Sequence, residues 1–175
     1  MRVLIALDRT EGAADAARAI ARWAGDTKPE VHLLHVIHPD HIRETAAPTG
    51  FVHSLTPAGT LAGQTLDVHE PYARLAEDRS QALARATTES EDYLRDIGAT
   101  YFPDMAVSTH VEPSEHTAEA IVRQAELIKA DFVAMASRER SGLGQRIFGS
   151  IHEEVVRACS VPVLVVGPGV TARAN

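Results

Sequence analysis

Four continuous apolar runs, separated by stretches with helical periodicity, constrain the fold of this chain most strongly. The runs cover residues 2–7, 31–37, 131–136 and 161–166. Unbroken rather than alternating hydrophobicity is typical of strands that are covered on both faces. A fifth run, residues 105–111, alternates more and predicts a strand near an edge of the sheet or on a half-exposed face.

The stretches between these runs repeat apolar residues every three or four positions, which predicts four helices. They cover residues 11–25, 72–97, 114–130 and 150–159. Gly25 and Gly98 are expected to end the first two helices. Strands that alternate with helices predict an α/β protein, a three-layer α/β/α sandwich around a five-stranded parallel sheet with right-handed crossovers.

A chain of 175 residues with 45% hydrophobic content can form one domain with a full core, predicted over residues 1–170 and followed by a short tail, 171–175. Residues 38–70 interrupt this pattern. They are rich in Pro, Gly, Thr and His, show no clear period and are too long for an ordinary connection. We expect this insertion to be a lid, an interaction arm or a partly disordered loop.

The net charge of -7 argues against a nucleic-acid partner or an anionic membrane, because both require a basic face. No run approaches 18 apolar residues, and the chain opens directly into an apolar strand without a signal-peptide pattern. We therefore expect a cytoplasmic protein. The single cysteine, Cys159, cannot form an internal disulfide and is expected to be a buried structural thiol.

The segment from Ala136 to Ser150 is glycine-rich and basic, and it connects a predicted strand to a predicted helix. Its charges are Arg138, Arg140 and Arg146 against Glu139. Glycines allow close approach to a ligand, and a helix start offers unpaired N–H groups, so the segment predicts a phosphate site. Ser150 and Glu153 have the spacing of a capping box, which predicts a helix start at Ser150. The alternative is an ordinary strand-to-helix loop with solvated arginines.

Ligands of parallel α/β sheets bind at the carboxyl ends of the strands. This rule selects Asp8, Val36 and Ala136, which end three different predicted strands. Asp8 has two open interpretations. Its carboxylate could accept hydrogen bonds from a ribose or hold a metal, or it could cap the helix that follows.

Other motifs predict neither catalytic residues nor metal ligands. Histidines recur at positions 32, 35, 38 and 41, but His32 and His35 should point to opposite faces of a strand. Gly144 and Gly149 have P-loop spacing, yet Ser150 stands where that motif requires lysine. No nucleophile elbow is present, and neither a Cys/His pair nor a carboxylate pair stands out from the solvated charges.

Together these features resemble the universal stress protein family. The resemblance covers the chain apart from residues 38–70, and it is carried by residues 3–8, 34–36, 136–150 and 161–166. It implies a small α/β domain, flavodoxin-like or adenine nucleotide α-hydrolase-like. It also implies a homodimer paired through the edge strand from Val161 to Val166 and, in many members, ATP binding.

In the ATP-binding members, the phosphate loop reads Gly, two residues, Gly, nine residues, then Gly with Ser or Thr. Gly149 and Ser150 match its end, whereas Ala136 and Glu139 replace its first two glycines. The resemblance implies that Asp8 contacts the ribose and that Val36 meets the adenine through its backbone. The residues implied to surround the phosphates, beside Ala136, are Ser137, Arg138, Gly149 and Ser150.

Glu139 is the departure with the largest expected consequence, because its carboxylate would repel a triphosphate. The leading interpretation is a stress-response module that binds an adenine nucleotide, ATP with Mg²⁺, with at most slow hydrolysis. The alternative is a nucleotide-free member of the same family that acts only through protein interaction. A related α-hydrolase enzyme would need a Ser/Gly-rich loop after the first strand, where residues 8–12 read Asp-Arg-Thr-Glu-Gly.

Overall fold

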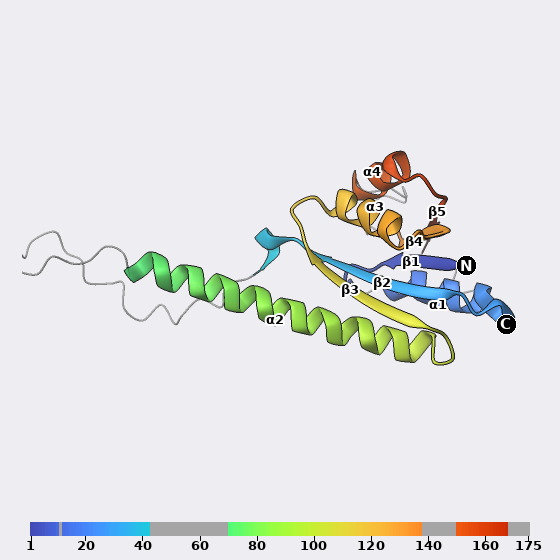
Figure 1. The fold of residues 1–175 in the computed structure, drawn as a ribbon, viewed down its shortest axis with the longest axis horizontal. Helices are drawn as coiled ribbons and strands as arrows, with labels where there is room; N and C mark the ends of the chain where they lie inside the picture. Colours follow the sequence, from blue (N-terminus) through green and yellow to red (C-terminus); the bar gives the residue numbers. More distant parts are fainter. Residues whose placement is uncertain (11, 43–69, 138–149, 168–175) are drawn as a thin grey trace, which may run out of the picture.

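The computed structural model describes residues 1–10, 12–42, 70–137 and 150–167 (Figure 1). The elements in these ranges are β1 (Arg2–Ala6), α1 (Ala14–Ala24), β2 (Glu30–Ile37), α2 (Glu70–Tyr101), β3 (Val107–Pro113), α3 (Thr117–Leu127), β4 (Phe132–Ala136), α4 (Ser150–Ala158) and β5 (Val163–Val166). Short 3-10 turns cover Gly25–Thr27 and Pro39–His41. Most of the predicted insertion, and the predicted tail, lie outside the described residues.

The strands form one parallel sheet in the order β3-β2-β1-β4-β5. The central strand, β1, pairs on one side with β2 and on the other with β4; Ile5, for example, lies between Leu33 and Ala134. The alternating order of strands and helices and the parallel pairing confirm the predicted α/β fold.

Helices lie on both sides of the sheet, with α3 and α4 on one side and α2 on the other (Figure 1). Each face of the sheet has its own hydrophobic core. The first core, between the sheet and helices α1 and α2, includes Val3, Ile5, Leu33, Ile20 and Leu94. The second core, between the sheet and helices α3 and α4, includes Leu4, Leu34, Val133, Ile121 and Val155. Burial on both faces explains the continuous apolar runs of the inner strands, since neither side of these strands meets water.

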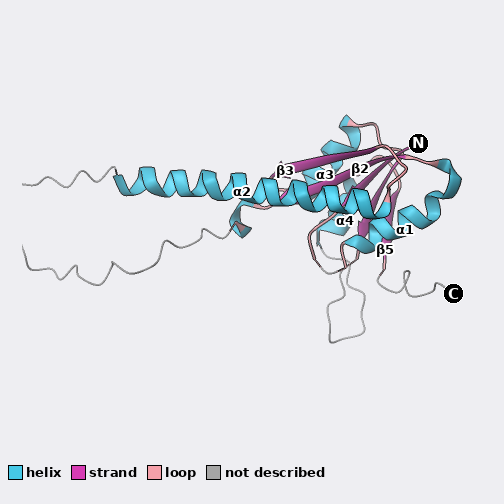
Figure 2. Ribbon diagram, turned by 90° about the horizontal axis from the view of Figure 1, so that it is seen from below, coloured by secondary structure: helices cyan, strands magenta, loops and turns pink. Residues whose placement is uncertain are grey.

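Helix α2 is longer than predicted. It passes through Gly98 and ends at Tyr101. A Cβ at Gly98 would lie 3.1 Å from Cγ1 of Val107, so this glycine permits close contact between α2 and β3 rather than ending the helix. The 32 residues of α2 span about 48 Å, whereas the longest strand, β2, has 8 residues and spans about 27 Å. The N-terminal part of α2 therefore extends beyond the sheet (Figures 1 and 2).

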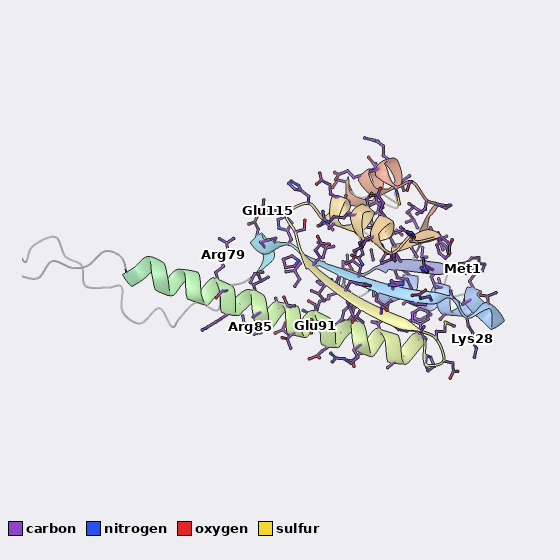
Figure 3. All side chains as sticks on the ribbon, in the orientation of Figure 1. Met1, Lys28, Arg79, Arg85, Glu91 and Glu115 are labelled. Atoms are coloured by element: carbon purple, nitrogen blue, oxygen red, sulfur yellow. The ribbon has the colours of Figure 1, made fainter. Side chains whose placement is uncertain are left out.

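Helix α2 has a polar, solvent-exposed face. Arg79, Arg85 and Glu91 lie along α2 with exposed side chains (Figure 3).

The two edge strands also follow from their surroundings. Strand β3 is half-buried along most of its length, which agrees with its predicted edge position. The last strand begins at Val163 rather than Val161, because Pro162 has no N–H to donate; its carbonyl accepts the main-chain bond from Val133 at 2.9 Å.

Cys159 is half-buried rather than buried as expected, and it packs against the second core. It directly follows the last residue of α4, where the helix ends and its apolar side is only partly covered. The thiol is nevertheless a packing group, as its position at helical spacing from Val155 indicated.

Candidate functional site

The candidate site lies at the C-terminal rim of the sheet, where the winding direction of the fold reverses. Strands β2 and β3 lie on one side of β1, and strands β4 and β5 lie on the other side. Such a switch point leaves a crevice outside the strand ends, which is the general ligand position in open α/β sheets. Asp8 follows β1 and Ser137 follows β4, so the two residues lie on either side of this point.

Asp8 closes the turn between β1 and α1. Its carboxylate oxygen Oδ1 accepts hydrogen bonds from the Thr10 amide at 3.1 Å and the Thr10 hydroxyl at 2.5 Å. The N-cap of α1 is Ala13, which forms no side-chain capping bond. The interpretation of Asp8 as a helix cap is therefore wrong, because its turn with Thr10 ends before the helix begins. The exposed carboxylate instead lies at the rim.

Arg9, next to Asp8, has a left-handed backbone conformation with φ 54°. This region is sparsely populated by residues other than glycine, and such strain is concentrated at functional sites and turns. The Arg9 guanidinium Nη1 lies 3.4 Å from the Glu89 carboxylate on α2. The pair is solvent-exposed and contributes little to stability, about 0–1 kcal/mol.

His35 and Tyr93 lie close enough to Asp8 and Arg9 to feel their charges. Nδ1 of His35 donates to the Leu7 carbonyl at 2.7 Å, and burial lowers the pKa of His35 below its usual value. The ring is therefore neutral at pH 7 and carries its proton on Nδ1. Burial, followed by the negative charge of Asp8, raises the pKa of Tyr93, so the phenol is protonated. The His35 ring and the Tyr93 phenol near Asp8 are thus uncharged groups that can form hydrogen bonds.

Val36 lies on β2 beyond the end of its pairing with β1. The last main-chain bond between these strands runs from the Leu7 amide to the Leu34 carbonyl at 2.9 Å. On its other side, β2 continues to pair with β3, where Val36 lies opposite Glu112. The half-buried Val36 side chain packs against the second core, which fixes the strand at this point.

Ala136 and Ser137 mark where the chain leaves β4, and Ser150 marks where it enters α4. The Ser137 amide donates to Val166 at 2.8 Å, and the Ala136 carbonyl accepts from Nε2 of His152 at 2.9 Å. Helix α4 starts at Ser150, as predicted. Ser150 is the first helical residue, and Glu153 lies in the first turn of α4.

The structure thus brings Asp8, Val36, Ala136 and Ser137 to the C-terminal ends of neighbouring strands, with Ser150 at the adjoining helix start. The other two predicted contacts, Arg138 and Gly149, lie outside the described residues, as does Glu139. The sequence did not predict Arg9, Tyr93 or His152 as residues of the site. Of these, His152 offered a signal, since a histidine two positions after Ser150 falls in the first turn of a helix that follows a glycine-rich segment.

The histidines of β2 contact different parts of the molecule. His32 lies on β2 with Nδ1 3.0 Å from Nε2 of His110 on β3, and the two rings stack. His35 instead contacts Leu7. Within the described ranges, no group of three or more His, Cys, Asp or Glu side chains could hold a metal ion.

A cavity lies away from the rim, between α3 and α4. This cavity of about 620 Å³ is lined by Ala118, Glu119, Val122, Arg123, Glu126, Glu154, Arg157 and Ala158. Its charged groups are of both signs, and Arg123 pairs with Glu112 of β3.

No helix in the described part of the chain is both long and apolar enough to cross a membrane.

Known proteins share this sequence pattern and this fold. Residues 1–167 match the universal stress protein family. The structure is similar to that of the hypothetical protein MJ0577, with a TM-score of 0.66 and 22% identity, covering 99% of this chain and 96% of that chain. None of the curated proteins matches the sequence significantly.

Two further similar structures contain nucleotides. A universal stress protein in complex with cAMP has a TM-score of 0.50 and 17% identity, covering 95% of this chain and 96% of that chain. The universal stress protein from Archaeoglobus fulgidus in complex with dAMP has a TM-score of 0.50 and 18% identity, covering 95% and 97%. At these identities the likeness shows a shared fold.

Proposed function

Because the chain belongs to the universal stress protein family, we propose that it is a stress-response module that binds an adenine nucleotide, ATP or AMP, at the C-terminal rim of its sheet. The observation that carries this proposal is the convergence of Asp8, Val36, Ala136 and Ser137 around the switch point. The similar structures with cAMP and dAMP support an adenine nucleotide as the ligand.

Each part of a nucleotide has a chemically suitable neighbour in this proposal. The exposed Asp8 carboxylate accepts hydrogen bonds from the ribose hydroxyls. The main chain of Val36, beyond the β1 ladder, meets the adenine. Ser137 and the α4 start at Ser150 face the phosphates, since a helix N-terminus offers free N–H groups and favours anions. The sequence pattern adds Arg138 and Gly149, which lie outside the described residues, as further proposed phosphate contacts.

We propose that ATP brings Mg²⁺ with it, because this ion is commonly bound through phosphate oxygens and water rather than by a dedicated protein cage. The protein acts as a binding module with at most slow hydrolysis. Asp8 lies on the ribose side of the proposed site, and its Oδ1 is engaged by Thr10. In this proposal the Asp8 carboxylate therefore binds the ribose rather than activating water at a phosphate.

The proposed module acts as a homodimer. Strand β5 is the last strand of the sheet, and the Leu164 side chain is 43% exposed. An apolar edge strand exposes unpaired main-chain groups and invites association. Pairing with β5 of a second copy about a two-fold axis would satisfy both edges at once.

Thermal unfolding with and without millimolar Mg-ATP tests the nucleotide proposal. A ligand at a hundredfold its dissociation constant adds about 2.7 kcal/mol of stability, which raises the midpoint by roughly 5–10 °C for a domain of this size. Asp8→Ala should reduce this rise, because it removes the ribose acceptor. Thr10→Ala is the matched control, since it weakens the same turn but keeps the carboxylate.

Absence of a rise in the wild-type protein would favour the alternative function, a nucleotide-free module that acts through protein interaction. The sequence observation behind this alternative is Glu139 in place of a motif glycine. An equal loss in Asp8→Ala and Thr10→Ala would show that the turn, rather than the carboxylate, supports the ligand.

A further inference from the structure

We propose that His152 is a positioning residue for the phosphates of the bound nucleotide, because it joins the end of β4 at Ala136 to the start of α4. This inference rests on the proposed function. Its basis is the hydrogen bond between Nε2 of His152 and the Ala136 carbonyl, at 2.9 Å. The bond links the last residue of β4 to the first turn of α4.

The β4 end of this link is fixed from a second side. Ala136 lies opposite Val166 in the parallel ladder, and the Ser137 amide donates to the Val166 carbonyl at 2.8 Å. The main chain at Ala136 and Ser137 is therefore held by β5 through one bond and by α4 through another. The main chain that would contact a phosphate here is already fixed in position. Less conformational entropy is therefore lost on binding.

The α4 end of the link is also rigid. Val155, one turn after His152, is fully buried in the second core, and Ile151 packs against the same core. The His152 ring is itself only part-exposed. A packed helix therefore carries the imidazole, and the bond to Ala136 ties the start of α4 to the end of β4.

The chemistry of the contact assigns the proton. A carbonyl can only accept, so Nε2 carries hydrogen and donates it to Ala136. The other ring nitrogen, Nδ1, is buried and has no hydrogen-bond partner among the described residues. Within that part of the chain, the Nε2 bond is thus the polar contact that orients the ring.

The location of His152 separates its effect from that of the adenosine contacts. His152 holds β4 to α4, where the phosphates are proposed to lie, whereas Asp8 follows β1 and Val36 lies on β2. Loss of the link should therefore weaken ligands that carry phosphate and spare adenosine. A residue that merely stabilises the fold would affect both ligands in the same proportion.

Isothermal titration of the full chain with Mg-ATP and with adenosine tests this inference. His152→Gln keeps an amide N–H at a reach similar to Nε2, whereas His152→Asn is too short and His152→Leu has no donor. We expect Asn and Leu to raise the ATP dissociation constant roughly three- to tenfold, as one lost hydrogen bond predicts. Their adenosine affinity should be unchanged, and His152→Gln should bind ATP within about twofold of the wild type.

Two results would overturn the inference while leaving the proposed function intact. One is wild-type ATP affinity in His152→Asn. The other is an equal loss of ATP and adenosine binding, which would assign His152 a packing role. If the wild-type protein binds neither ligand, the proposed function itself fails. The Asn and Gln variants decide the question even if His152→Leu does not fold.

Discussion

Leu94→Ala tests whether the C-terminal half of α2 anchors this long helix to the sheet. Leu94 is 0% exposed in the first core. The substitution removes three carbon groups, which corresponds to about 2.4 kcal/mol of lost transfer free energy at about 0.8 kcal/mol each. The cavity left behind brings the expected loss to about 3–5 kcal/mol. Leu83→Ala, at a half-buried position nearer the helix N-terminus, should cost less than about 1.5 kcal/mol.

Urea unfolding followed by tryptophan fluorescence measures both changes. Trp23, the single tryptophan, packs edge-on against Phe132 of β4 with ring centroids 5.5 Å apart, so its emission reports loss of the sheet packing. The transition midpoint should fall strongly for Leu94→Ala at an unchanged m-value. A loss below about 1 kcal/mol for Leu94→Ala, or an equal loss for Leu83→Ala, would refute this account of how α2 is held.

Two further predictions concern pH and association. Burial lowers the pKa of His35 and, with the nearby His32 ring, that of His110, so the unfolded chain binds more protons near pH 6. Stability should therefore be greatest above pH 7 and fall as the pH drops through about 6.5; a free energy of unfolding that stays constant from pH 7.5 to 5.5 would contradict this. Val165→Arg on β5 should release monomers in sedimentation velocity, and an unchanged dimer would exclude β5 pairing.

Much of the fold followed from hydrophobic pattern alone, because strands buried on two faces require continuous apolar runs. Val3, Leu4 and Ile5 all have 0% exposure, although their side chains alternate between the two cores. The end of α2 could not be predicted in the same way. Gly98 has the sequence signature of a helix terminus, but close packing against Val107 determines its role, and that contact depends on tertiary structure.

The positions of the rim residues could be predicted because parallel strands end on the same side of a sheet. This rule selected Asp8, Val36 and Ala136 without knowledge of their partners. The bond between His152 and Ala136 was not predictable, since it joins residues 16 positions apart through a side chain. The electrostatic effect of Asp8 on Tyr93 likewise depends on how α2 lies across the sheet.

Amide NMR spectra of the isotope-labelled protein during titration with Mg-ATP would test the central claim most directly. The account predicts saturable shifts of the amide signals of Asp8, Val36, Ser137 and Ser150, which belong to four separate elements or their ends but one rim. Unchanged spectra at millimolar ATP, or shifts confined to the cavity between α3 and α4, would contradict a nucleotide site at the C-terminal ends of the strands.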